Sequence, residues 1–112
     1  YPEKTQAIYL VDVIEHIFAE EEPTFIRNLV HTLAPDGFIL IGTPNAAAEQ
    51  YASIHSREGH VNTKTHAALR QLGRTYFKNV FSFSMNDEVV HTGFGPMSHY
   101  LWILGIGPRN LP

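Results

Sequence analysis

Two stretches of the sequence decide the expected fold: residues 10–17, LVDVIEHI, and residues 33–45, LAPDGFILIGTPN. The first reads as the end of a buried strand followed by an acidic corner that contains a histidine. The second reads as the end of a helix and a buried strand that stops at Thr43-Pro44-Asn45. Since open α/β sheets bind ligands beyond the carboxyl ends of their strands, we expect the polar residues at both strand ends to contribute to one site.

The rest of the hydrophobic pattern predicts an α/β fold. Apolar residues at three- and four-residue steps predict amphipathic helices, and short apolar runs predict strands buried in a sheet. Pro35-Asp36-Gly37 predicts a turn that ends the first helix. The expected elements, in order, are a strand at residues 7–11, a helix at 20–33, a strand at 38–41, a short helix near 46–53 within a long loop at 43–62, a helix at 65–77, and strands at 80–84 and 99–106 separated by a loop at 86–98.

Composition narrows the classes of function. The chain has 112 residues, 44% of them hydrophobic and 17% charged, which suits one compact domain. Its formal net charge is −3 and its basic residues are scattered, so we expect no nucleic-acid partner. It has no cysteine, which excludes disulfides and thiolate metal sites. No apolar run reaches the roughly 20 residues of a membrane span and no signal pattern is seen, so we expect a soluble, cytoplasmic protein.

The order of elements and the two motifs at residues 10–17 and 33–45 resemble the second half of a class I S-adenosylmethionine-dependent methyltransferase domain. The nearest branch contains ubiquinone-type O-methyltransferases and sugar methyltransferases. The resemblance implies that residues 1–112 are the C-terminal part of a single domain, from its fourth to its seventh strand, in a partial Rossmann-like sheet with flanking helices. It also implies that the last strand, residues 99–106, is inserted antiparallel beside the fifth strand of the family fold, which corresponds to residues 38–41.

The same resemblance implies that the N-terminal, cofactor-binding half of the domain is absent from this sequence. Three cofactor-binding features of the family are not found: a glycine-rich turn after a first strand, an acidic residue at the end of a second strand, and a segment that flanks adenine. Gly93 and Gly95 do not replace that turn, because a proline and a strand follow them instead of a helix. We therefore expect this chain to supply only one wall of a cofactor pocket.

Asp12, Glu15 and His16 form the pattern acid-x-x-Glu-His just after the first expected strand. The resemblance implies that this corner faces the cofactor and the acceptor, and that Val11, Asp12 and Val13 help to enclose the methionine part of S-adenosylmethionine. Without the resemblance, the two carboxylates are equally well explained as groups that stabilise the start of a helix.

The acid-x-x-Glu-His spacing also resembles the Mg²⁺ site of plant small-RNA 2′-O-methyltransferases, which implies a metal site made by Asp12, Glu15, His16 and His60. Carboxylates suit Mg²⁺, and two histidines also suit Mn²⁺ or Zn²⁺. The alternative is that the histidines are solvated or bonded to backbone. Without a metal, His16 or His60 is the candidate general base that removes the acceptor's hydroxyl proton during methyl transfer.

A second polar cluster, Asn86-Asp87-Glu88 followed by residues 89–94, lies between the last two expected strands. It resembles loops of polysaccharide and nucleotide-sugar methyltransferases, which implies a sugar-containing acceptor, although a solvated hairpin explains it equally well. The candidate acceptor-binding residues are Pro44, Asn45, Tyr51 and His91.

The predicted function is methyl transfer from S-adenosylmethionine to a hydroxyl of a small, sugar-containing acceptor, once the missing half is supplied. Two alternatives stay open: a non-catalytic module that acts in assembly, and an unrelated metal-binding α/β domain. The strand at residues 7–11 would lie beside an unfilled sheet position, and such an open edge predicts a homodimer.

Overall fold

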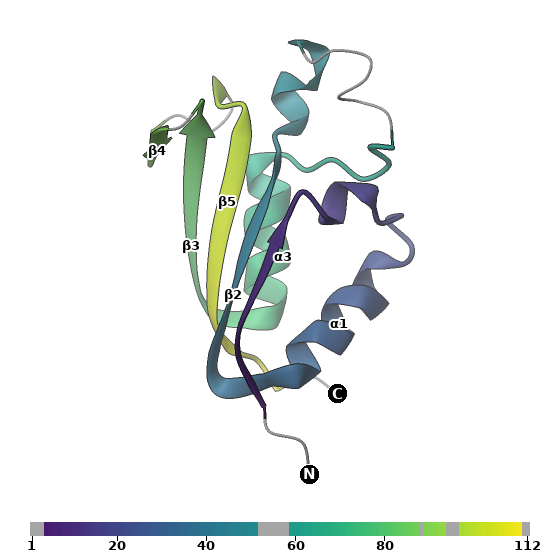
Figure 1. Cartoon of the computed structure of the whole chain (residues 1–112), viewed down its shortest axis with the longest axis vertical. Coiled ribbons are helices and arrows are strands. Elements are labelled where there is room, and N and C mark those ends of the chain that lie inside the picture. The colour runs from purple at the N-terminus through teal and green to yellow at the C-terminus, as the bar shows by residue number, and fades with distance from the viewer. Residues whose placement is uncertain (1–3, 52–58, 88, 94–96, 111–112) are drawn as a thin grey trace.

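A mixed five-stranded sheet forms the centre of the computed structural model, which describes residues 4–51, 59–87, 89–93 and 97–110, without the side chains of residues 49–51 (Figure 1). The elements in chain order are β1 (Thr5–Val11), a short 3-10 helix η1 (Ile14–His16), α1 (Glu22–Thr32), β2 (Leu33–Pro44), a second 3-10 helix η2 (Ala46–Tyr51), α3 (His66–Tyr76), β3 (Phe77–Asn86), β4 (Val89–His91) and β5 (Tyr100–Pro108).

The strand order in the sheet is β1-β2-β5-β3-β4. β1 and β2 are parallel, whereas β5 is antiparallel to both of its neighbours, β2 and β3. This confirms the predicted α/β class and the antiparallel insertion of the last strand. Because β2 and β3 both oppose β5, they run in the direction of β1. The carboxyl ends of these three strands therefore lie at one end of the sheet.

Both helices form where the sequence predicts them, within two residues at each end. α1 has Pro23 in its first turn, where no hydrogen bond is lost, and buries Ile26 and Val30. The N-terminus of α3 is capped by Thr65, whose hydroxyl accepts a hydrogen bond from the Ala68 amide at 3.1 Å. Local sequence signals thus account for both helices.

Two predicted connections are wrong in form. Pro35-Asp36-Gly37 does not make a separate turn, because β2 begins at Leu33, directly after α1. The register runs from Thr5 opposite Leu33 to Ala7 opposite Phe38, so the extra residues of β2 are accommodated as an irregularity within the strand. The predicted loop at 86–98 contains strand β4, which pairs with the end of β3 after Asp87 adopts a left-handed φ of 52°.

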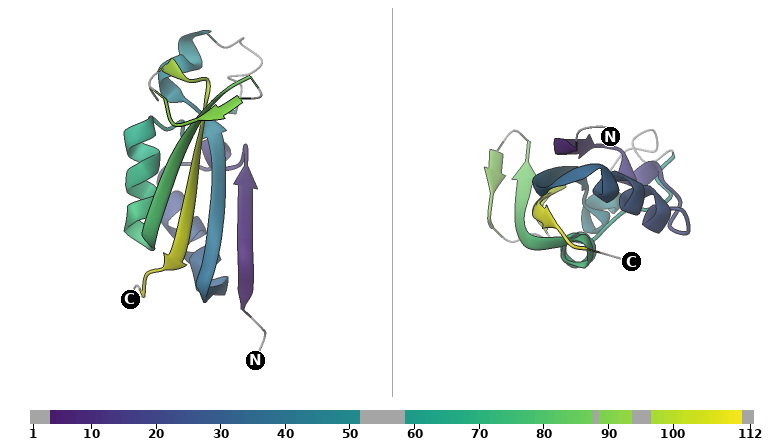
Figure 2. Two further views of the ribbon diagram at one scale, coloured as in Figure 1. Left: turned by 90° about the vertical axis from the view of Figure 1, so that its left-hand side faces the viewer. Right: turned by 90° about the horizontal axis from the view of Figure 1, so that it is seen from below.

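The two faces of the sheet differ. One packs against α1 and α3 around buried Ile39, Ile41, Leu101 and Ile103 (Figure 2). The other face, here called the open face, carries the alternate residues of each strand, and no described element covers it. Its large apolar members are Tyr9, Val11, Phe38, Leu40, Phe81, Phe83, Trp102, Leu104 and Ile106.

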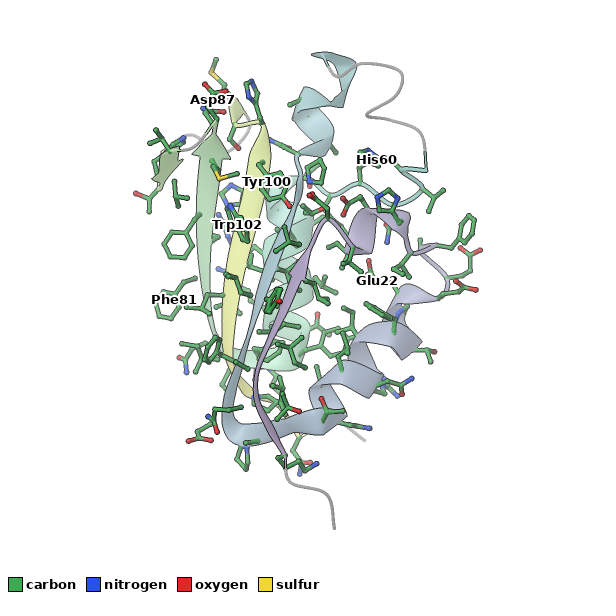
Figure 3. All side chains as sticks on the ribbon, viewed as in Figure 1. Glu22, His60, Phe81, Asp87, Tyr100 and Trp102 are labelled. Atoms are coloured by element: carbon green, nitrogen blue, oxygen red, sulfur yellow. The ribbon has the colours of Figure 1, made fainter. Side chains whose placement is uncertain are left out.

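Trp102 shows how tightly the open face is built. A Cβ at Gly42 would lie only 2.6 Å from the Trp102 ring, so the glycine allows the indole to lie against β2. The indole Nε1 is buried and has no hydrogen-bond partner among the described residues. Figure 3 shows Phe81 of the same face on the side of the sheet away from both helices.

In the described part of the chain, no helix is long and apolar enough to cross a membrane.

β1 lies at the edge of the sheet and, within the described residues, pairs with β2 alone. Two of its side chains on the open face are solvent-exposed, Tyr9 by 77% and Val11 by 42%. An unpaired strand edge beside an exposed apolar face is a template for association with another chain.

We therefore expect the chain to self-associate through β1, and Tyr9→Lys to shift the equilibrium towards monomer, because a charge on the edge strand opposes pairing. Sedimentation velocity across a wide range of protein concentrations measures this. The matched control is Phe18→Lys, which replaces another exposed aromatic residue outside the sheet. A wild-type chain that stays monomeric at high concentration, or equal association of both variants, would contradict the expectation.

Candidate functional site

Glu15, His16 and His60 meet beyond the carboxyl end of β1. Each offers one ligand atom, and these atoms all lie within 4.8 Å of one another. Glu15 and His16 belong to η1, whereas His60 comes from the segment that precedes α3. The two imidazole rings pack edge to face with their centroids 5.2 Å apart. The structure thus joins three of the four residues that the sequence suggested as metal ligands.

The carboxylate of Glu15 is buried, with a residue exposure of 1%. Its Oε1 accepts a hydrogen bond from the hydroxyl of Thr43, a fully buried residue near the end of β2, at 3.1 Å. Its Oε2 lies 3.8 Å from Nε2 of His16, which is too long for a hydrogen bond. A buried carboxylate is costly unless it is paired or coordinates a metal, and the two imidazoles of the cluster are the groups beside it.

His16 is held in one orientation by the backbone of Gly59. Its Nδ1 lies 2.9 Å from the Gly59 carbonyl oxygen, and because a carbonyl only accepts, Nδ1 carries the proton and donates. The Nε2 lone pair therefore faces the cluster. A hydrogen bond from the far ring nitrogen to a carbonyl is how metal-binding histidines are usually oriented. Gly59 permits this contact with a left-handed φ of 79°, since a Cβ there would lie 3.2 Å from His16 Nδ1.

The segment that carries His60 is docked on η1 by its backbone. The amides of Val61 and Asn62 both donate to the carbonyl oxygen of Glu15, at 2.9 and 3.1 Å. Together with the Gly59 carbonyl, these contacts fix the chain on both sides of His60. The position of His60 therefore depends on long-range backbone contacts.

Asp12, the fourth suggested ligand, points elsewhere. It follows β1 directly with a left-handed φ of 59°, and its amide donates to the Gly42 carbonyl at 3.0 Å. Its carboxylate accepts a 2.6 Å hydrogen bond from the Tyr100 hydroxyl. Burial of the phenol, and next this hydrogen bond, raise the pKa of Tyr100 above its ordinary value. The sequence placed Tyr100 only within a strand, and its register opposite Pro44 explains its presence at this edge.

The suggested acceptor-binding residues are dispersed. Asn45 is buried, and its amide is engaged within the protein: Nδ2 donates to the Ser98 carbonyl at 2.8 Å, and Oδ1 accepts from the Ala47 amide at 3.0 Å. Pro44 is half-buried, and the side chain of Tyr51 lies outside the described residues. His91 is in β4, at the opposite edge of the sheet from β1. Their roles in acceptor binding stay predictions.

The residues suggested for the cofactor wall lie around the same corner. Val11 is exposed on the open face, whereas Val13 is half-buried against the core and its carbonyl begins η1 by accepting from the His16 amide at 3.0 Å. Their contact with a cofactor also stays a prediction.

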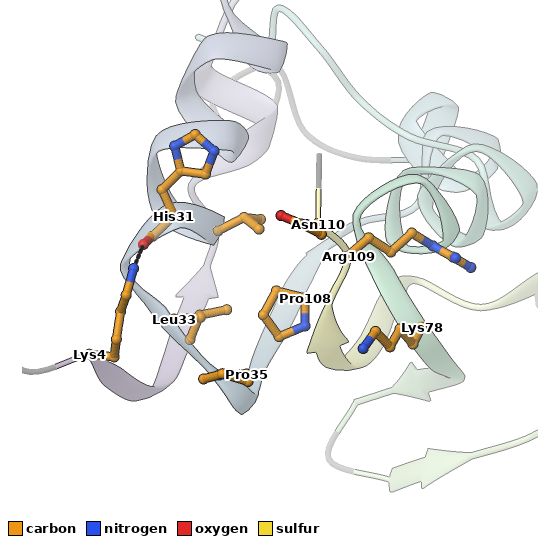
Figure 4. A pocket seen from close by; sticks show the side chains of 9 residues that line it. Lys4, His31, Leu33, Pro35, Lys78, Pro108, Arg109 and Asn110 are labelled. Carbon is orange, nitrogen blue, oxygen red and sulfur yellow. Dashed lines mark hydrogen bonds between the residues drawn. The ribbon is translucent and has the colours of Figure 1, made fainter. Parts of the chain in front are cut away.

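A cavity of about 560 Å³ lies at the other end of the sheet, between the start of β1 and the end of β5 (Figure 4). Basic residues line it, but two of them secure the fold: Lys4 Nζ donates to the His31 carbonyl at 2.7 Å, and Arg109 Nε donates to the Arg74 carbonyl at 2.9 Å. The cavity is remote from the strand ends where α/β sheets bind ligands.

Neither a family model nor a curated protein matches the chain. Several solved structures are similar to it, and two of them are methyltransferases. The N-methyltransferase NodS from Bradyrhizobium japonicum WM9 is 19% identical, with a TM-score of 0.59 over 97% of this chain and 54% of that chain. The methyltransferase domain of bacterial CtHen1-C is 18% identical, with a TM-score of 0.64 over 91% of this chain and 52% of that chain.

These similarities show the fold: the sheet of this chain is part of a Rossmann-like methyltransferase fold. The chain spans about half the length of the two structures. The finer assignment to the ubiquinone-type or sugar branch is not resolved by them.

The raised pKa of Tyr100 predicts a pH dependence of stability. An unfolded tyrosine ionises near pH 10, so the stabilisation from the protonated folded phenol is present below about pH 10 and is lost as pH rises above it. Tyr100→Phe should lower stability at neutral pH by about 1 kcal/mol and flatten its decline above pH 10. Urea unfolding at several pH values measures this, with the exposed Tyr9→Phe as control. Identical alkaline slopes for wild type and Tyr100→Phe would refute it.

Proposed function

We propose that this chain forms the acceptor side of an S-adenosylmethionine-dependent methyltransferase that methylates a hydroxyl of a small, sugar-containing molecule. The observation that carries the proposal is the cluster of Glu15, His16 and His60 at the carboxyl ends of parallel strands, the usual ligand edge of such sheets. The methyltransferase fold supports the reaction class, and the cluster supports a hydroxyl acceptor, whose proton must be removed.

We propose that the cluster holds a divalent ion, Mg²⁺, Mn²⁺ or Zn²⁺, through Glu15, His16 and His60. The residues fit such an ion: one buried carboxylate and two imidazoles offer ligand atoms within 4.8 Å of one another, and Nε2 of His16 faces the cluster. Asp12 is left out because Tyr100 binds its carboxylate. When bound, the ion supplies a Lewis acid that lowers the pKa of an acceptor hydroxyl.

The residues of the chain divide the remaining tasks. When no ion is bound, His16 or His60 is the candidate general base that takes up the proton of the acceptor hydroxyl. Glu15, fixed by Thr43, balances the positive charge that develops on either ring. Methyl transfer is an in-line displacement that requires alignment above all, and a cluster held by backbone hydrogen bonds is suited to positioning a sugar hydroxyl.

For S-adenosylmethionine itself, the described residues fit one side of a pocket. The backbone of Val11, Asp12 and Val13 would border its methionine part, while the edge of β1 and the open face are where a further half of the domain would pack. We therefore propose that cofactor binding requires that half, in keeping with the length of the two similar structures.

The 112-residue chain by itself should bind S-adenosylmethionine weakly or not at all, and a protein that includes the complementary half should bind it. Isothermal titration of both forms measures the difference. A low-micromolar dissociation constant for the 112-residue chain would overturn this division. With the complete protein, methylation of amines but not of sugar hydroxyls would favour the activity named for NodS over the one proposed.

The cluster makes a second prediction that does not depend on the cofactor. Mn²⁺ or Zn²⁺ should raise the melting temperature by mass action. At a free ion concentration of 100 times the dissociation constant, the free energy of unfolding should rise by about 2.7 kcal/mol. Glu15→Ala should abolish the rise, because it removes the carboxylate ligand. The control is Glu20→Ala, an exposed residue outside the cluster. If no divalent ion shifts the wild-type melting temperature, the histidines remain candidate bases only.

A further inference from the structure

Three polar side chains link the His60 segment to the start of α1. Glu22 Oε1 accepts from Asn62 Nδ2 at 2.7 Å and from Lys64 Nζ at 2.6 Å. Lys64 Nζ also donates to Asn62 Oδ1 at 3.3 Å, which closes a triangle of contacts. The side chains of Lys64 and Glu22 are only 13% and 14% exposed. None of the three belonged to the site suggested by the sequence.

The environment makes this a firmer contact than an ordinary surface ion pair. Exposed pairs are weakened by water and salt and contribute little, whereas partial burial strengthens the attraction. Glu22 is also the first residue of α1, where the helix dipole favours a carboxylate. Two independent electrostatic terms therefore hold the Glu22 carboxylate in place.

Asn62 and Lys64 belong to the segment that contains His60, and Figure 3 shows His60 and Glu22 on the same side of the molecule. That segment contacts η1 through Gly59 and through the Val61 and Asn62 amides, and the Lys64 carbonyl accepts from the Ala46 amide at 2.8 Å, beyond the end of β2. Glu22 adds the link to α1. His60 thus lies in a short stretch held from η1, from the start of η2 and from α1, while Glu15 and His16 are part of η1 itself.

We propose that Glu22, Asn62 and Lys64 form a clamp that positions His60 relative to Glu15 and His16, and thereby sets the affinity of the cluster for a divalent ion. The inference rests on the metal site proposed above. Ligand distances in metal sites vary by only about 0.2 Å, so a small displacement of the segment removes His60 from the coordination sphere. The three residues are positioning residues and do not touch the ion.

The test compares Glu22→Gln with Glu21→Gln, using Mn²⁺ as the probe and isothermal titration of the whole chain. Glu22→Gln keeps the size of the side chain and removes the ion pair. Glu21→Gln removes a charge from the same exposed helix end, so it controls for the helix dipole. We expect the Mn²⁺ dissociation constant to rise about tenfold for Glu22→Gln, as for other residues that orient metal ligands, and to stay unchanged for Glu21→Gln.

Lys64→Met should reproduce the loss of Mn²⁺ affinity. The double variant, Glu22→Gln with Lys64→Met, should lose less binding free energy than the sum of the two single variants, because both changes break the same contact. Lys64→Met also carries the test if Glu22→Gln does not fold. A second readout needs no metal: hydrogen exchange of the Val61 and Asn62 amides should accelerate in Glu22→Gln and not in Glu21→Gln.

The outcomes separate the clamp from the metal site. Wild-type binding of Mn²⁺ with unchanged affinity in Glu22→Gln and Lys64→Met overturns the clamp alone. Equal losses of Mn²⁺ affinity in Glu21→Gln and Glu22→Gln also overturn it, because they would show that the effect comes from the negative charge at the start of α1 and not from the contact with Lys64. A wild-type chain that binds no Mn²⁺ refutes the metal site, and the role of the clamp with it, whatever the exchange rates show.

Discussion

The insertion of β5 between β2 and β3 is the constraint on which the rest of the structure depends. The backbone of β5 pairs with β2 on one side and with β3 on the other. Its side chains alternate between the two faces: Leu101 and Ile103 lie in the core, while Trp102 lies against Gly42 on the open face. Because β5 opposes its two neighbours, the carboxyl ends of β1, β2 and β3 meet at one end of the sheet. That end is where the polar residues of the candidate site gather.

The same sheet is covered on one face only within the described residues. Sheets built from parallel strand–helix–strand units normally carry helices on both faces, because their strands are apolar throughout. Here the open face presents large apolar side chains, among them Tyr9, Phe38 and Phe81, next to the unpaired edge of β1. These two features support our proposal that a further half of the domain packs there, and the chain spans about half the length of the two similar methyltransferase structures.

The candidate site is made by backbone contacts as much as by its side chains. Glu15 supplies a carboxylate to the cluster and a carbonyl to the His60 segment, and His16 is oriented by the carbonyl of Gly59. The buried carboxylate of Glu15 accepts a hydrogen bond from the Thr43 hydroxyl and lies beside two imidazoles, and such partners reduce the cost of burying its charge. Its position at the ligand edge of the sheet is the reason why we place the proposed site there.

The sequence by itself determined the elements that depend on local physics. Residue periodicity predicted α1 and α3, and the apolar runs located β1 and β2. The acid-x-x-Glu-His pattern put Glu15 and His16 together, because they are neighbours in one turn. The position of β5 between β2 and β3 came from the family resemblance and not from these local signals.

Only the tertiary structure decided the contacts between distant residues. The register of β5 carries Tyr100 to Asp12, 88 residues away, and so separates Asp12 from the cluster. The sequence suggested Asn45, at a strand end, for acceptor binding, yet its side chain is buried and its amide donates to the carbonyl oxygen of Ser98. Glu22 and Lys64 are 42 positions apart in the sequence, and they meet because the His60 segment docks on η1 and so lies beside the start of α1. Local propensity cannot encode such contacts, since they depend on strand register and on the closure of long loops.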